Sequence, residues 1–200
     1  MKTYIFTTFL IILLSSCKVT STLYPISENP SDFIFKKEVL GKWGDKKDSL
    51  IYFIADTATG SDGKLYTITS VEYNEQKKRN DTTRILARLI SISTSYFLDC
   101  QIDMEKEFQA EKKDYGSWLI GRHFIININF TATDKIEIGF PDQDGLIKLI
   151  DQKKIVADYA LLKEDDYLIL DKPVILKRAV VASLKYPSLY KEKIVLQSLR

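Results

Sequence analysis

Cysteine and histidine are scarce in this chain of 200 residues. It has two cysteines, Cys17 and Cys100, and one histidine, His123, and it contains no CxxC pair. Structural zinc sites take four such ligands, and thioredoxin-type redox centres take two neighbouring cysteines. Glycine motifs for phosphates or dinucleotides are missing too. We therefore expect no cofactor and no metal site.

An excess of either charge is also missing. The 29 Lys and Arg residues stand against 27 Asp and Glu residues, which leaves a formal net charge of +2. The densest basic run, Lys77-Lys78-Arg79, falls in a polar loop. Domains that bind nucleic acid gather positive charge on one face, so we expect no nucleic-acid partner. Hydrophobic residues make up 45% of the chain, which is typical of a folded domain.

No hydrophobic run reaches the length of about 20 residues that spans a bilayer. Residues 5–14 are apolar apart from Thr7 and Thr8, and they follow the cation Lys2. This is the pattern and length of a secretory signal. The next residues, Leu14-Ser15-Ser16-Cys17, combine a leucine, two small residues and a cysteine. They resemble the lipobox of bacterial lipoproteins.

The lipobox resemblance implies cleavage before Cys17 and acylation of this residue. Residues 1–16 would then be a lipoprotein signal peptide, and Cys17 the lipid attachment site on a membrane. Each buried acyl CH₂ contributes about 0.8 kcal/mol to such an anchor. Lys18 follows the cysteine and no acidic residue stands beside it, which favours the outer membrane. The alternatives are an ordinary signal peptide followed by a chance cysteine, and an uncleaved N-terminal helix.

Residues 17–32 are small, polar and proline-containing, which predicts a lipid-anchored tether. Residues 33–200 then form a single globular, β-rich domain. Period-two alternation and β-branched residues predict strands, and proline or aspartate before apolar residues at helical spacing predicts helices. We expect strands over residues 49–55, 64–73, 83–92, 95–103, 123–130, 135–140, 167–170 and 194–199, and helices over 145–153 and from Pro173 to Pro187. The fold class is α+β, with a predominantly antiparallel, strongly curved or barrel-like sheet of about six to eight strands and C-terminal helices.

Leu40-Gly41-Lys42-Trp43 looks like the GxW opening of lipocalin-like barrels. Three further features are Tyr96-Phe97-Leu98-Asp99, the strand that begins His123-Phe124, and the helix before a short last strand. Together they resemble an uncharacterised family of bacterial envelope lipoproteins, over about residues 38–199. This resemblance implies no catalytic residues.

The residues that could carry chemistry have simpler interpretations. Cys100 shares a strand face with Tyr96, Leu98 and Ile102, so it is expected in the core as an inert thiol. His123 has no GxSxG nucleophile motif to serve. The run 142–145, Asp-Gln-Asp-Gly, lacks the remaining ligands of a calcium loop, and Asp144 is expected to cap a helix. We therefore predict no catalytic residues and no enzyme.

The leading functional hypothesis is a membrane-anchored lipoprotein of the cell envelope with a non-catalytic binding or scaffolding role. The alternative is a lipocalin-like carrier of a small apolar ligand, and an enzyme ranks third. The strands at Leu50 and at Arg84 are apolar on both faces, as in strands that are covered on both sides. This pattern favours a filled core over a hollow barrel. The expected partners are the membrane, through the anchor, and an envelope protein or a small apolar ligand.

Overall fold

The computed structural model describes residues 20–45, 48–57, 63–74, 78–103, 121–162, 167–191 and 193–199. The expected signal peptide and the lipid attachment site Cys17 lie outside these residues. No helix among the described residues has both the length and the apolar character needed to cross a membrane.

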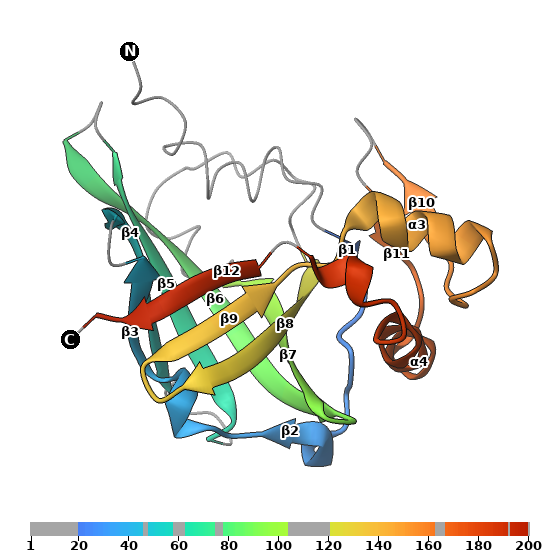
Figure 1. Cartoon of the computed structure of the whole chain (residues 1–200), viewed down its shortest axis with the longest axis horizontal. Helices are drawn as coiled ribbons and strands as arrows, with labels where there is room; N and C mark the ends of the chain where they lie inside the picture. The colour runs from blue at the N-terminus through green and yellow to red at the C-terminus, as the bar shows by residue number, and fades with distance from the viewer. Residues whose placement is uncertain are drawn as a thin grey trace.

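Eight antiparallel strands close into a barrel (Figure 1). Seven follow one another along the chain, each paired with the next, and the eighth, β12, pairs with both β9 and β3. Closure leaves the barrel strands without a free edge. This confirms the predicted antiparallel, barrel-like sheet. The barrel strands are β3 (Gly41–Asp45), β4 (Asp48–Thr57), β5 (Leu65–Asn74), β6 (Arg79–Ile92), β7 (Ser95–Ile102), β8 (His123–Ala132), β9 (Lys135–Gly139) and β12 (Lys193–Ser198).

A helical layer is inserted between β9 and β12. It contains α3 (Gln143–Asp151), β10 (Tyr159–Leu161), β11 (Tyr167–Ile169), α4 (Pro173–Ser183) and a 3-10 helix, Pro187–Tyr190. Proline opens both α4 and the 3-10 helix, because its fixed φ suits a first turn and its missing N–H is not needed there. The two predicted helices are therefore present, close to their expected positions.

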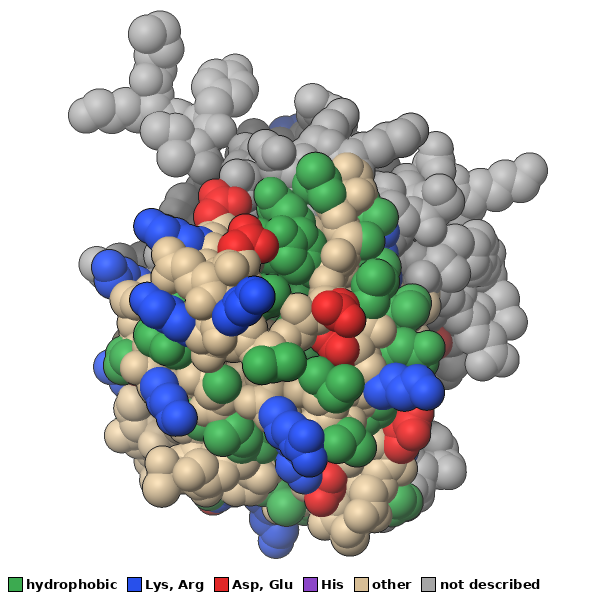
Figure 2. All heavy atoms as spheres, turned by 90° about the vertical axis from the view of Figure 1, so that its right-hand side faces the viewer, with side chains coloured by type: hydrophobic (Ala, Val, Ile, Leu, Met, Phe, Trp, Pro, Cys, Tyr) green, Lys and Arg blue, Asp and Glu red, His purple; other side chains and the backbone are tan. Residues whose placement is uncertain are grey.

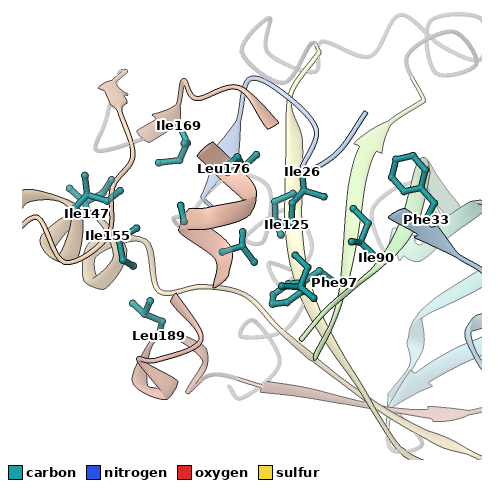
Figure 3. Close-up of a cluster of buried hydrophobic side chains, with 14 residues drawn as sticks. Ile26, Phe33, Ile90, Phe97, Ile125, Ile147, Ile155, Ile169, Leu176 and Leu189 are labelled. Atoms are coloured by element: carbon teal, nitrogen blue, oxygen red, sulfur yellow. The ribbon is translucent and has the colours of Figure 1, made fainter. Parts of the chain in front are cut away.

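The helical layer packs against the outer face of the barrel at β6, β7 and β8. Phe97 of β7 and Ile125 of β8 point outward and join a buried cluster with Ile147, Leu176 and Leu189 of the layer (Figure 3). The ring of Phe97 meets the ring of Tyr190 edge to face, with centroids 6.5 Å apart. Since strand side chains alternate, these strands are covered outside by helices and face the barrel interior with their other side.

The N-terminal segment belongs to the domain from residue 20 onward. Strand β1 (Ser21–Thr22) pairs with β8 and β11, and β2 (Phe33–Ile34) pairs with β6. Ile26 is fully buried, and Lys177 of α4 donates to Asp32 at 2.8 Å. The expectation that residues 17–32 form a tether outside the domain is therefore wrong for residues 20–32. A two-residue strand and a single buried isoleucine leave no periodic pattern to detect.

Candidate functional site

The barrel encloses a cavity of about 130 Å³. All eight strands contribute inward-facing side chains to its wall. The wall is formed by Val39, Trp43, Phe53, Ala55, Ile68, Thr83, Ile85, Leu98, Cys100, Ile102, Phe124, Ile126, Ile128, Ile136, Ile138, Phe140 and Leu196. An apolar cavity of about 150 Å³ in another protein stays dry and binds benzene. The cavity in this barrel is thus large enough for a ring or a short alkyl chain.

The lining follows from the period-two pattern of the strands. Leu98, Cys100 and Ile102 of β7 point inward, as the alternation predicts. Burial, and secondarily the neighbouring charge of Asp99, raises the pKa of the Cys100 thiol far above its usual range. Cys100 is 3% exposed, so the expectation of a core cysteine is confirmed. A thiol held neutral is a poor nucleophile.

One end of the barrel is closed by the 3-10 helix Lys37–Val39 and the residues around it. The indole Nε1 of Trp43 donates to the carbonyl of Val39 at 2.9 Å. The hydroxyl of Tyr66 accepts from the backbone N–H of Lys36 at 2.7 Å and donates to its carbonyl at 3.2 Å. Gly41 has a φ of +124°, a conformation that glycine adopts readily. The GxW motif therefore turns the chain into β3 and seats Trp43 in the cavity wall.

The opposite end of the interior becomes polar along the β5–β6 ladder. On the face of the ladder that carries Ile68 and Ile85, the paired residues change from Tyr66/Ala87 and Ile68/Ile85 to Ser70/Thr83, Glu72/Asp81 and Asn74/Arg79. The last two of these pairs lie beyond the end of the β6–β7 pairing at Ile85/Ile102, at the mouth of the barrel. Ser70 is 1% exposed, and its Oγ has no hydrogen-bond partner in the described part of the chain. Burial of Glu72, and then the charge of Asp81, raises the pKa of the Glu72 carboxyl.

His123 and Asp99 meet on the outer face of the barrel. Nδ1 of His123 lies 2.7 Å from Oδ1 of Asp99, and Oδ2 of Asp99 accepts from the backbone N–H of Ile26 at 2.7 Å. The pair lines a groove of about 470 Å³ beneath residues 25–33. Within the described ranges, no serine, threonine or cysteine is hydrogen-bonded to His123. Through these two contacts Asp99 orients the imidazole and holds the N-terminal segment on the barrel.

The acidic run at the start of α3 is a helix terminus. The helix begins at Gln143, so Asp142 takes the N-cap position, although its side chain makes no capping hydrogen bond. The expectation that Asp144 caps this helix is therefore wrong by two positions. No cluster of three or more His, Cys, Asp or Glu side chains capable of holding a metal ion occurs among the residues that the structure describes.

The helical layer presents apolar side chains to solvent. Val174 of α4 is 66% exposed and Val156, before β10, is 76% exposed. Figure 2 shows hydrophobic side chains interspersed with lysines, arginines and acidic residues on the side of the molecule that carries this layer. The large exposed hydrophobic residues of the layer are Val156, Leu161, Leu162, Leu170, Val174, Ile175 and Val181.

Comparison of the chain with protein-family models, with curated proteins and with solved structures gave no match. The eight strands run up and down and close into one ring, which is the architecture of an up-and-down β-barrel.

Proposed function

We propose that this chain binds a small apolar ligand inside its barrel, as a lipid-anchored protein of the bacterial cell envelope. The observation that carries the binding role is the closed barrel around an apolar cavity of about 130 Å³. The sequence favours scaffolding first, because strands that are apolar on both faces suggest a filled core. The structure covers the outer face with helices and leaves space on the inner face, which favours the carrier role instead.

The expected affinity is moderate. Each buried CH₂ contributes about 0.8 kcal/mol, so an alkyl chain of roughly six to eight carbons contributes about 5–6 kcal/mol. The loss of translational and rotational freedom offsets part of this gain. A ligand of this size therefore binds with a Kd of about 0.1 mM or weaker unless polar contacts add to the affinity.

The test is a titration of the delipidated chain from residue 18 onward, which contains every residue that the structure describes. An environment-sensitive apolar dye and short alkyl compounds serve as probes. Trp43 lines the cavity, so its fluorescence reports occupancy once the other tryptophan is removed by Trp118→Phe. We expect saturable, one-to-one binding that quenches Trp43.

Two variants locate the binding site. Ala55 lines the cavity and is 3% exposed, so Ala55→Phe places a ring in the ligand's space and should abolish binding. Val195 lies outside on β12 and is 40% exposed, so Val195→Phe should leave binding intact. Circular dichroism checks that both variants are folded. A wild-type chain that binds none of the probes, or an Ala55→Phe variant that binds as well as the wild type, would contradict the proposal.

The lipid anchor is supported by Leu14-Ser15-Ser16-Cys17 and by the preceding hydrophobic run. Metabolic labelling with a fatty-acid analogue should mark the wild-type protein and leave Cys17→Ala unlabelled and released from membranes. Persistent labelling of Cys17→Ala would refute the anchor. Fractionation of the membranes tests the outer-membrane location that Lys18 favours.

Scaffolding is the second candidate function, and the exposed apolar side chains of the helical layer favour it. Several exposed apolar side chains on one layer of a protein mark a contact surface more often than a single exposed residue does. A photoreactive residue at position 174, on α4, should form a defined crosslinked species in cells, and one at Thr133, in the β8–β9 turn, should not. Equal crosslinking at both positions would count against a partner on this surface.

A further inference from the structure

The inner face of the β5–β6 ladder divides the barrel interior into an apolar part and a polar end. Tyr66 and Ile68 stand toward the closed end, and Ser70 and Glu72 follow on the same face of β5. Two residues along a strand span about 6.8 Å. The polar end is therefore within reach of the head group of a ligand whose apolar part occupies the cavity.

The unpartnered hydroxyl of Ser70 indicates that the ligand carries a polar group at this end of the barrel. Its neighbours in register are Phe53 on β4 and Thr83 on β6, and both line the cavity. A buried hydroxyl without a partner costs free energy, and native structures rarely keep one without a reason. A ligand group that hydrogen-bonds to the Ser70 Oγ would remove this cost.

The carboxylates of Glu72 and Asp81, which follow Ser70 along the ladder, indicate which kind of head group the ligand carries. Glu72 and Asp81 face each other across the strands, where directly opposed side chains lie about 5 Å apart. Asp81 accepts from Asn74 at 2.7 Å and pairs with Arg79 at 3.3 Å. Burial and the charge of Asp81 both disfavour the ionised form of Glu72, which is why its pKa is raised. A cation beside Glu72 would relieve both effects.

At the closed end, the ammonium of Lys36 already contacts two aromatic rings. The ammonium of Lys36 lies 4.6 Å from the ring centroid of Tyr96 and 5.2 Å from that of Phe130, at distances typical of cation–π contacts. An anionic head group at the closed end would have to compete with these rings for Lys36 and, at that end, would leave Ser70 without a partner. The two ends therefore favour one orientation and one sign of charge.

We propose that the ligand of the barrel is a cationic amphiphile, with its apolar chain in the cavity and a primary ammonium group bound by Ser70, Thr83 and the Glu72–Asp81 carboxylates. An ammonium offers three donors and no acceptor, which complements two carboxylates and two hydroxyls. This inference rests on the proposed function, since it requires that the cavity bind a ligand.

The test compares three probes with the same chain and different head groups: octylamine, 1-octanol and octanoate. They are titrated calorimetrically into the chain from residue 18 onward at about pH 7, where the amine is protonated. Charge-assisted hydrogen bonds are worth more than neutral ones, so we expect octylamine to bind about tenfold or more tighter than octanoate, with 1-octanol between them.

The variants identify the groups responsible. Glu72→Gln should weaken octylamine about tenfold, through the loss of a charge-assisted contact, and leave 1-octanol unchanged. Ser70→Ala should weaken both the amine and the alcohol. The matched control is Glu137→Gln, on the outer face of β9 between Lys135 and Lys193, which should change neither.

The outcomes separate this inference from the proposed function. Octanoate binding equal to or tighter than octylamine, with a loss in Lys36→Met, would overturn the cationic assignment and leave the cavity as a binding site. Equal binding of all three probes would also overturn it, because the head group would then make no contact. If none of the probes binds, the inference and the proposed function both fail.

Discussion

Replacing Phe97 with alanine should remove a main contact between the barrel and its helical layer. Phe97 is fully buried on the outer face of β7, where it joins the cluster of Ile147, Leu176 and Leu189 and meets the ring of Tyr190. Phe-to-Ala changes in cores cost about 3–5 kcal/mol. The free energy of unfolding of a domain is about 5–15 kcal/mol in total. Phe97→Ala should therefore remove a large share of the stability.

The neighbouring residue provides the matched variant. Leu98 points into the barrel and lines the cavity, so Leu98→Ala should cost about 2–5 kcal/mol and also enlarge the cavity. The two substitutions destabilise the same strand from opposite faces. We therefore expect Leu98→Ala to change the affinity for 1-octanol and Phe97→Ala to leave it unaltered.

Urea unfolding, followed by far-ultraviolet circular dichroism, measures the two losses of stability, provided that the m-values agree. In a domain of this size, each kcal/mol lowers the Tm by about 2–4 °C. A loss below about 1 kcal/mol in Phe97→Ala would refute the packing described for the helical layer. An equal change of ligand affinity in both variants would refute the assignment of the two faces.

Three further predictions concern single side chains. Burial raises the folded-state pKa of Glu72 above its ordinary value of 4.5, so stability falls as the pH rises from 4.5 through the folded pKa and stays lower above it. Glu72→Gln should therefore be more stable than the wild type near neutral pH in urea unfolding, with the difference vanishing below about pH 4.5. The reverse order at neutral pH would contradict this. Lys177 lowers the pKa of Asp32 below 3.8, so the pair stabilises the fold above this value and the stabilisation is lost as the pH falls through the lowered pKa. Lys177→Met should therefore cost at most about 1 kcal/mol of stability at neutral pH, as exposed pairs do, and less in high salt. A large, salt-independent loss would refute this prediction. Cys100→Asp introduces an unpaired charge into the core and should cost more than about 4 kcal/mol, whereas Cys100→Ser should cost about 1–3 kcal/mol; equal melting temperatures would contradict the buried position.

The regular elements were predictable where the pattern was long. In β8, Phe124, Ile126 and Ile128 recur at every second position, and the structure places these three in the cavity wall. Helix α4 was predictable from Pro173 in its first turn, and α3 from the helical spacing of the apolar residues around Ile147. The apolar face of each helix had to be buried. Local propensity and side-chain periodicity are enough for such segments.

The remaining features depend on contacts that are distant in sequence. Closure of the barrel requires β12 to lie between β9 and β3, and no local pattern specifies that pairing. The burial of Ile26 depends on the strands and helices around it. Ser70 and Glu72 could have been placed on the same face as Tyr66 and Ile68 from the period-two spacing of β5. Their pairing with Thr83 and Asp81 could not, because it depends on the register between β5 and β6.

The existence of an accessible apolar cavity is tested most directly by the crystal structure of the protein under xenon pressure. Xenon enters apolar cavities of this size, and its electron density needs no chosen ligand. We predict xenon inside the barrel, among Phe53, Leu98 and Ile126, and no xenon there in Ala55→Phe. A barrel interior filled by its own side chains, with no xenon in the wild-type protein, would contradict the proposal that the barrel is a binding site.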